Sequence, residues 1–326
     1  MSKSIKILIF KTDRLGDLIN ISPIIYNLKQ HFKNIDLTIV CSKYNSQILK
    51  YYPEVTNVLI FQKSLSFFYL KYFKKLFMRK YDYLFQFDGK KNSYISSIFI
   101  NSKIKCGIRF VKQKKIFNKT QNISRPNYLI QKFFNYLEFC NEDYQSKDNH
   151  KFHYLSLYLN IIKKYNINVA SINHYLNYSE KNNQKIENYL HLHIDQRWDL
   201  YDSNFFKKFL NKLIEVSMKK NIVITSNLEG NKFYNDLKNQ TYKLKAFHFK
   251  DDVTLESLLN IILYSNSVLT IHSGFIVHAA AAFNKNIIDL VPENIYNELD
   301  RWIPFNVNYK RYNINNFLDL TLDNND

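Results

Sequence analysis

Short apolar runs alternate with helical patterns along both halves of the chain, and this alternation most restricts the folds open to it. Strands are expected at 5–10, 36–41, 58–61, 83–87, 189–194, 222–225, 246–249, 268–271 and 287–291. Helices are expected after Ser22-Pro23 and at 129–139, 203–219, 229–239, 254–264 and 275–283. Strands separated by helices favour parallel sheets joined by right-handed crossovers. The sequence therefore predicts an α/β protein built from two Rossmann-like domains in tandem.

A length of 326 residues also favours two domains over one. Two polar stretches, 141–149 and 179–185, separate the strand-rich halves. The boundary is expected between 150 and 185. We place it so that the domains span 1–165 and 166–326.

The chain carries a net charge of +18, from 46 basic and 28 acidic residues. A strongly basic surface attracts nucleic acid, anionic membranes or phosphorylated substrates. Only seven of the basic residues are Arg, and the heavy use of Lys, Asn and Ile is also typical of an AT-rich genome. Both causes of the charge stay open, and no nucleic-acid module is evident in the sequence.

No apolar run approaches the ~20 residues of a membrane-spanning helix, and the start Met1-Ser-Lys-Ser leads into an expected strand. We therefore expect a cytoplasmic protein. The three cysteines, Cys41, Cys106 and Cys140, lie far apart and show no disulfide framework. They are expected to be buried free thiols.

The loop Lys11–Leu18 follows the first expected strand and places Asp17 behind a glycine. Open α/β sheets bind ligands at the carboxyl ends of their strands. Asp17 suits two roles there, a general base or a first-turn acid that caps a helix. Asp13 and Arg14 are expected to pair with each other.

A second strand end carries His191, His193, Asp195 and Arg197. The two histidines alternate and so share one face of the strand, but no further ligand stands at a spacing typical of zinc. We predict no metal. Arg197 suits either a surface ion pair or bidentate binding of a diphosphate.

A third strand end leads through His272, Ser273 and Gly274 into a helix of small residues. Such a helix start presents free N–H groups and a positive dipole end, which favour phosphate. It matches neither a Walker loop nor G-x-G-x-x-G. His278 lies about one turn into this helix and suits either a ligand contact or a buried, hydrogen-bonded position.

The segment Phe67–Lys80 interleaves aromatic residues with Lys and Arg. It suits either a core-facing helix with a solvated lysine face or a helix that lies on an anionic membrane.

Five of these features together resemble glycosyltransferase family 9, the group that contains the lipopolysaccharide heptosyltransferases. They are Lys11-Thr-Asp-Arg-Leu-Gly-Asp17, Pro23, the strand Tyr81–Gly89, Arg197-Trp198, and Ser273-Gly-Phe-Ile-Val-His278 followed by four alanines. They occur in the family's order along nearly the whole chain. The aspartate that the family's last motif carries falls on Ser273 or His272, so a negative charge near the donor is expected to be lost.

The resemblance implies a GT-B architecture, two Rossmann-like domains facing across a cleft, with the acceptor on the N-terminal domain. It implies an inverting, metal-independent transfer of a heptose or related sugar from a nucleoside-diphosphate-sugar to a lipid-linked or core-oligosaccharide acceptor, without a cofactor. Asp17 would be the general base, and Lys11 and Arg14 would lie on the acceptor side. The residues implied at the donor are Arg197, Ser273, Gly274, His278 and His272.

If the segment Phe67–Lys80 lies on an anionic membrane, the cytoplasmic protein would be peripheral at the inner face of the inner membrane. A non-catalytic nucleotide- or carbohydrate-binding protein of the same fold is the alternative. Nucleic acid is not an expected partner.

Overall fold

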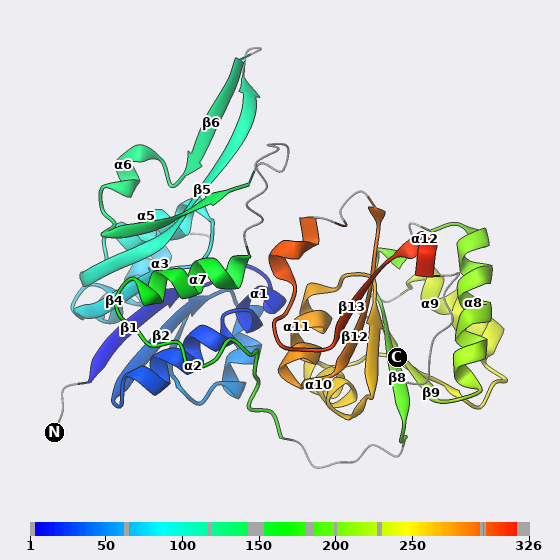
Figure 1. The fold of residues 1–326 in the computed structure, drawn as a ribbon. Coiled ribbons are helices and arrows are strands. Elements are labelled where there is room, and N and C mark those ends of the chain that lie inside the picture. Colours follow the sequence, from blue (N-terminus) through cyan, green and yellow to red (C-terminus); the bar gives the residue numbers. More distant parts are fainter. Residues whose placement is uncertain are drawn as a thin grey trace. The chain divides into compact units, whose positions relative to one another are not determined.

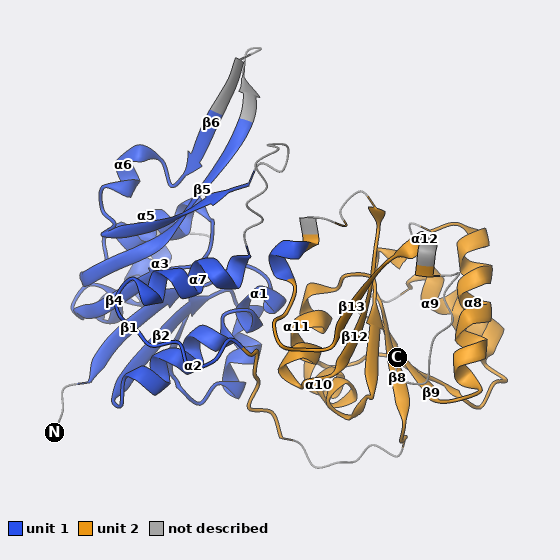
Figure 2. Cartoon of the chain, in the orientation of Figure 1, with its two compact units in different colours: residues 1–172, 300–302 blue, residues 173–299, 303–326 orange. Residues whose placement is uncertain are grey.

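The computed structural model describes residues 4–61, 65–116, 119–142, 153–179, 186–198, 201–226, 230–293, 296 and 298–317 (Figure 1). Most of the polar stretches 141–149 and 179–185 lies outside these residues. The chain divides into two compact units, residues 1–172 with 300–302 and residues 173–299 with 303–326 (Figure 2). The expected boundary at 165/166 lies a few residues before this division.

Unit 1 is built on a seven-stranded sheet of order β3-β2-β1-β4-β5-β6, with β7 paired to β5. The strands are β1 Ile5–Phe10, β2 Ile35–Cys41, β3 Val55–Ile60, β4 Tyr81–Gln86, β5 Ser102–Ile116, β6 Lys119–Arg125 and β7 Tyr136–Asn141. All pairs are parallel except β5 with β6, which form an antiparallel hairpin. In Figure 1 this hairpin extends beyond the rest of the sheet.

Helices cover both faces of this sheet, with α2 and α7 on one face and α3 and α5 on the other (Figure 1). The helices are α1 Leu15–Ile19, α2 Ser22–His31, α3 Leu65–Lys71, α4 Phe73–Leu76, α5 Lys91–Ile98, α6 Tyr128–Gln131 and α7 Tyr154–Lys163, with a 3₁₀ helix at Asn45–Tyr51. Alternate residues of β1, Leu8 and Phe10, pack with Phe68 and Leu76 in one fully buried core. The period-2 pattern of a strand thus feeds two cores, one on each face.

Unit 2 repeats the strand order of unit 1, because its sheet runs β10-β9-β8-β11-β12-β13 and is parallel throughout. The strands are β8 Tyr189–Ile194, β9 Asn221–Ser226, β10 Phe247–Lys250, β11 Ser267–Thr270, β12 Asn286–Val291 and β13 Tyr309–Asn313. The helices are α8 Ser203–Ser217, α9 Lys232–Thr241, α10 Leu255–Tyr264, α11 Gly274–Ala282 and α12 Ile314–Phe317, with a 3₁₀ helix at Glu298–Trp302.

The two faces of β8 contribute to different layers. Leu190, Leu192 and Ile194 pack into a large core that contains residues of α8 and α9. Tyr189 faces α10 and donates a hydrogen bond to Ile261 O at 2.6 Å. His191 and His193 share the face of Tyr189, as their spacing predicts.

The expected elements differ from the structure mainly between residues 91 and 163. A helix was expected at 129–139, but α6 ends at Gln131 and residues 136–141 form strand β7, which pairs with β5. Ser22 was expected to be the N-cap of the next helix, with Pro23 as its first residue. In the structure Ile21 is the N-cap and Ser22 is the first residue of α2. The three cysteines are buried and unpaired, which confirms that expectation.

The shared strand order has a direct functional consequence. In an order 3-2-1-4-5-6, the chain turns in opposite directions after strands 1 and 4, and ligands bind in the crevice at this switch point. In unit 1 the switch point lies between β1 and β4, and in unit 2 between β8 and β11. Lys11–Asp17 follows β1, and Arg197 and His272 follow β8 and β11.

Candidate active site

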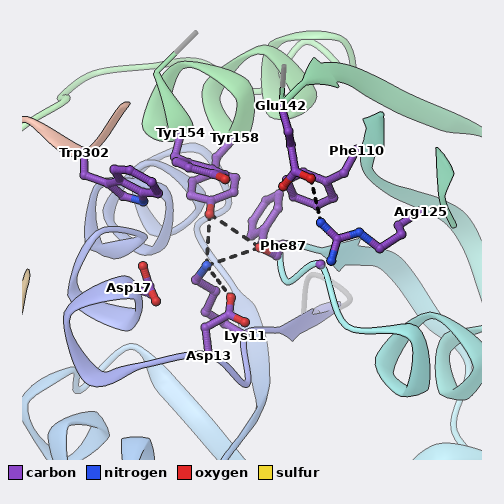
Figure 3. Close-up of a pocket in the computed structure, with 11 residues that line it drawn as sticks. Lys11, Asp13, Asp17, Phe87, Phe110, Arg125, Glu142, Tyr154, Tyr158 and Trp302 are labelled. Atoms are coloured by element: carbon purple, nitrogen blue, oxygen red, sulfur yellow. Dashed lines mark hydrogen bonds and ion pairs between the residues drawn. The ribbon is translucent and has the colours of Figure 1, made fainter. Parts of the chain in front are cut away.

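A pocket opens at the switch point of unit 1 (Figure 3). The loop after β1 contributes Lys11, Asp13 and Asp17 to it, and the loop after β4 contributes Phe87 and Gly89. The remaining lining residues come from β5, from β6, from the residue after β7, from α7 and from the segment 300–302. They are Phe110, Arg125, Glu142, Tyr154, Tyr158 and Trp302. Arg14 does not line this pocket, and its side chain is exposed.

Lys11 lies at the base of the pocket and is 3% exposed. Its Nζ donates to Asp13 Oδ2 at 2.9 Å, to Tyr158 OH at 3.0 Å and to Phe87 O at 3.2 Å. Burial alone would lower the pKa of Lys11, but Asp13, Tyr158 and Asp17 together raise it well above its ordinary value. Since an ammonium has three N–H donors, Lys11 is fully occupied by the protein. Its effect on a ligand would be that of a fixed positive charge.

Asp17 is the third residue of α1 and lines the same pocket. Its Oδ2 accepts a hydrogen bond from the backbone N–H of Arg14 at 3.2 Å, so it caps the helix. No dashed line joins its carboxylate to the other side chains drawn in Figure 3. The capping role expected from the sequence is therefore present, and it leaves carboxylate acceptor capacity beside the pocket.

Asp13 pairs with Lys11, and more distantly with Lys90 at 3.9 Å, where a pair with Arg14 was expected. Asp88, fully buried behind the loop, accepts from Thr12 N and Thr12 Oγ1 at 3.1 and 2.8 Å and from Lys90 N at 3.1 Å. Burial and the nearby Asp13 raise the pKa of Asp88, while its hydrogen bonds oppose that shift. Asp88 thus ties the loop after β4 to the loop after β1 and holds the pocket base in shape.

The wall of the pocket is aromatic and carries one ion pair. Trp302 stacks on Tyr154 with ring centroids 5.1 Å apart. Arg125 Nη2 contacts Glu142 Oε2 at 2.7 Å (Figure 3). An added Cβ on Gly89 would lie 3.2 Å from the Phe110 ring, so a larger residue there would crowd the pocket. Such a wall suits a ligand with both an apolar ring face and polar edges.

At the switch point of unit 2, Arg197 is held in place after β8. Its Nε donates to Asp195 Oδ2 at 3.0 Å, its Nη2 pairs with the same atom at 2.7 Å, and its Nη1 donates to His272 O. These contacts leave two of the five guanidinium N–H groups, and the side chain is 34% exposed. The surface ion pair and the ligand contact expected as alternatives are therefore compatible.

The contact with His272 O brings Arg197 to the start of α11, where Ser273 is the N-cap and Gly274 the first helical residue. Nothing lies within 4 Å of a Cβ added to Gly274, so the space beside the helix start is open. The structure thus places Arg197, His272, Ser273 and Gly274 together at one sheet edge.

His278 lies deeper, at 2% exposure, and stacks on His174 with ring centroids 5.1 Å apart. Of the two positions that its sequence spacing allowed, the structure gives the buried one. A direct contact between His278 and a ligand stays a prediction.

Beneath this site, β8 carries two buried histidines on one face. His191 Nε2 and His193 Nδ1 both contact the hydroxyl of Thr225, at 2.8 and 2.9 Å. Burial, with Arg197 nearby, lowers the pKa of His193 to about 3, and burial also lowers the pKa of His191 well below its ordinary range. The two imidazoles are thus uncharged and tied to one hydroxyl.

The sequence predicts that a negative charge near Ser273 is lost, but a buried carboxylate lies close to this turn. Asp289 on β12 is fully buried and contacts both the backbone N and Nδ1 of His272 at 2.7 Å. A carboxylate therefore does lie under this turn, but His272 covers it.

Comparisons with solved structures place this architecture. A glycosyltransferase of family 9 from Veillonella parvula matches with a TM-score of 0.69 at 12% identity, covering 96% of this chain and 87% of that chain. E. coli ADP-heptose lps heptosyltransferase II matches with a TM-score of 0.67 at 12% identity, covering 94% and 90%. E. coli heptosyltransferase WaaC matches with a TM-score of 0.61 at 15% identity, covering 95% and 92%.

The chain has the fold of glycosyltransferase family 9. The structural matches thus agree with the resemblance that the sequence motifs indicated. They also confirm the expected GT-B architecture with two parallel-sheet units. No family model matches the sequence, and no curated protein matches it.

Several pocket residues of this family 9 fold were missed from the sequence. Tyr154 and Tyr158 are one helical turn apart, a spacing that could have marked one face of a helix. Arg125 ends β6 and Glu142 directly follows β7, and neither strand was predicted. Trp302 carries no sequence signal, because the short segment 300–302 belongs to unit 1 while the chain before and after it belongs to unit 2.

Proposed function

We propose that the chain is an inverting glycosyltransferase that moves a sugar from a nucleoside-diphosphate-sugar to an acceptor hydroxyl. One observation carries the proposal. The two switch points of a glycosyltransferase fold hold complementary chemistry, a pocket-lining carboxylate in unit 1 and an anchored, partly exposed guanidinium at a helix start in unit 2.

In this proposal Asp17 removes the proton of the acceptor hydroxyl, whose oxygen then attacks the anomeric carbon of the donor. Lys11 places a buried positive charge at the base of the same pocket, and the backbone N–H of Arg14 holds the Asp17 carboxylate by a hydrogen bond. The aromatic and ionic wall of the pocket holds the acceptor sugar. The acceptor side is thereby assigned to unit 1.

The bond that breaks leaves negative charge on a nucleoside diphosphate. Arg197 offers its remaining N–H groups, and Ser273–Gly274 offers the free N–H groups of the α11 start, to the phosphate oxygens. These donors stabilise the leaving group without a metal ion. His272, and His278 from one turn further along, complete the donor side.

The finer identity of the substrates follows the neighbours in fold. Two of these are E. coli heptosyltransferases, and one was solved with ADP. On that analogy we propose a heptose or related sugar as the group transferred and a lipid-linked or core-oligosaccharide intermediate of a cell-surface glycan as acceptor.

A thermal-shift panel tests the proposal most economically, since a ligand that binds the native state raises its stability. ADP, UDP, GDP and dTDP would each be added, alone and as sugar conjugates. We expect one nucleotide to raise the melting temperature, and Arg197→Ala to abolish the rise. A flat panel would contradict the donor site.

The alternative is a binding protein of the same fold that transfers nothing. It draws support from the missing motif aspartate, whose place falls on Ser273 or His272, because the carboxylate of Asp289 lies fully buried against His272. A wild-type protein that binds the nucleotide-sugar but neither transfers nor hydrolyses it, with Asp17→Asn unchanged, would favour this alternative.

We further propose that α3 and α4 rest on an anionic membrane surface at the inner face of the inner membrane. Phe68 and Leu76 face the core, while Phe67, Leu70 and Phe73 are exposed. Lys71, Lys74 and Lys75 stand exposed among them. Apolar side chains ringed by lysines suit the boundary between anionic headgroups and acyl chains. Among the described residues, no helix combines the length and apolar character needed to cross a bilayer.

A further inference from the structure

The second residue after β11 adopts an unusual backbone conformation. His272 has φ of +35°, a region that side chains other than glycine rarely occupy. Such conformations persist where surrounding contacts over-determine them, and they gather at functional sites. His272 is fixed from two sides, by Asp289 at its N–H and by Arg197 Nη1 at its carbonyl.

Asp289 is more than a backbone anchor. Its Oδ1 accepts from the N–H of His272 at 2.7 Å, and its Oδ2 accepts from the Tyr309 hydroxyl at 2.6 Å and contacts His272 Nδ1 at 2.7 Å. Burial and the neighbouring Asp289 raise the pKa of Tyr309, so the phenol keeps its proton and donates. A fully buried carboxylate surrounded in this way acts as acceptor for every contact.

The tautomer of His272 follows from this arrangement. Because the carboxylate can only accept, Nδ1 must carry the hydrogen that lies between them. In the neutral imidazole, the other ring nitrogen, Nε2, then presents a lone pair. Among the residues that the structure describes, Nε2 makes no hydrogen bond, and the side chain is 15% exposed.

The position of this lone pair is set by the same contacts. His272 directly precedes Ser273, the N-cap of α11, and Arg197 Nη1 donates a hydrogen bond to the carbonyl oxygen of His272. The site therefore offers cationic and N–H donors for a diphosphate together with one neutral acceptor. Phosphate oxygens can only accept, so they do not match Nε2, whereas a sugar hydroxyl can donate to it.

We propose that Asp289 is a positioning residue that fixes the Nδ1–H tautomer of His272, so that Nε2 accepts a hydrogen bond from a hydroxyl of the donor sugar. This inference rests on the proposed donor site. In this inference His272 contacts the sugar and not the diphosphate, and Asp289 and Tyr309 hold His272 in place.

The first test reads the imidazole directly. Long-range ¹⁵N–¹H spectra of the full-length protein should show His272 as the Nδ1–H tautomer, with its signals identified by their loss in His272→Asn. In Asp289→Asn the amide offers one acceptor where the carboxylate offers two, so the tautomer population should shift. A wild-type Nε2–H tautomer, or an unchanged spectrum in Asp289→Asn, would overturn the positioning role.

The second test separates sugar from diphosphate. The probes are the nucleoside diphosphate and the nucleotide-sugar that raise the melting temperature, measured by calorimetry. The amide of His272→Asn occupies the place of Nδ1 and keeps the contact with Asp289, but nothing replaces Nε2. Affinity for the nucleotide-sugar should fall about tenfold, the scale of one hydrogen bond, while affinity for the nucleoside diphosphate stays unchanged.

His272→Gln should restore part of the loss, because its amide reaches the place of Nε2. His248→Asn, a partly buried histidine on β10, is the control and should change neither affinity. Equal losses for both probes in His272→Asn would overturn the assignment to the sugar. Should no nucleotide-sugar bind, the proposed function and the sugar contact both fail, while the spectra still decide the role of Asp289.

Discussion

The two units share one strand order, but the cations at their switch points differ in burial and in free hydrogen-bond donors. In unit 1, β1 leads into a buried ammonium, Lys11, whose three N–H groups are all taken by the protein. In unit 2, β8 carries the uncharged pair His191 and His193 and holds its cation, Arg197, partly exposed at the sheet edge. The same topology thus produces one cation that acts at a distance and one that can touch a ligand.

In the proposed reaction, this contrast lets the same strand order serve two different steps. A general base needs a fixed charge nearby and room for a hydroxyl, which the unit 1 pocket offers around Asp17. A leaving diphosphate needs hydrogen-bond donors with free N–H groups, which Arg197 and the α11 start offer. The proposed division of labour therefore depends on which cation has donors to spare.

Lys11→Met tests the buried cation and should have the largest effect on stability. It leaves Asp13 without its closest partner and Tyr158 without a donor. We expect the free energy of unfolding to fall by about 3 kcal/mol, because removing one partner of a buried pair strands the other. Urea denaturation measures it. The control is Lys90→Met, whose side chain is 51% exposed and 3.9 Å from Asp13, with a loss of about 1 kcal/mol or less. Equal losses would show that burial of Lys11 is immaterial.

Asp17→Asn tests the carboxylate that Lys11 is proposed to serve. The amide can still accept from Arg14 N, so the helix cap survives while the base is lost. Turnover should fall by at least about 100-fold, the scale of general-base catalysis, with donor affinity unchanged. Asp13→Asn in the same loop is the control, with a smaller effect on turnover. Near-normal turnover in a folded Asp17→Asn protein would remove Asp17 from the mechanism.

The uncharged pair His191 and His193 predicts acid sensitivity. The pKa of His193 is about 3 in the fold and near 6.5 in the unfolded chain, so below pH 6.5 the unfolded state binds the extra proton. Stability is fully present above pH 6.5 and falls by up to about 1.4 kcal/mol per pH unit between 6.5 and 3. Urea unfolding at pH 7 and pH 5 measures the slope. His193→Gln, which cannot titrate, should reduce it, and an equal slope in both proteins would contradict the uncharged state of this pair.

The basic, partly apolar surface of α3 and α4 is expected to have the smallest effect per residue. Each lysine near an anionic membrane contributes about 1 kcal/mol, and salt screens this attraction. Vesicles with anionic lipid should sediment the protein at low salt and release it at high salt. Changing Lys71, Lys74 and Lys75 to Ser should weaken binding, whereas changing three exposed lysines of unit 2, Lys207, Lys208 and Lys219, should not. If the protein does not bind such vesicles at low salt, the membrane proposal fails, and the net charge is explained by the composition of the sequence alone.

The sequence predicted the parts of the fold that follow simple alternation. β1 and β8 have the expected bounds because each is a short apolar run at the centre of its sheet. β5 was missed because it is 15 residues long and rich in lysine, and it continues into a hairpin beyond the sheet. The helix expected at 129–139 is wrong over β7: Leu129, Phe133 and Leu137 recur at helical spacing, but Leu137 lies in the strand.

Site residues were predictable where they stand next to a strand end. Asp17, Arg197 and His272 all follow central strands, so their position in the chain marked them. Asp289 was not predictable, because it lies inside β12 and meets His272 only through the pairing of β11 with β12. Trp302 and Glu142 reach the pocket through the path of the chain, which no local pattern encodes.

One calorimetric measurement tests the contrast between the two switch points most directly. The nucleoside diphosphate selected by thermal shift would be titrated into the wild type, Arg197→Ala and Asp17→Asn. Affinity should weaken by about 1.5–3 kcal/mol in Arg197→Ala, the range for a charge-assisted hydrogen bond, and should not change in Asp17→Asn. The reverse pattern, with Arg197→Ala unchanged and Asp17→Asn affected, would place the nucleotide in unit 1 and contradict the proposed division of labour.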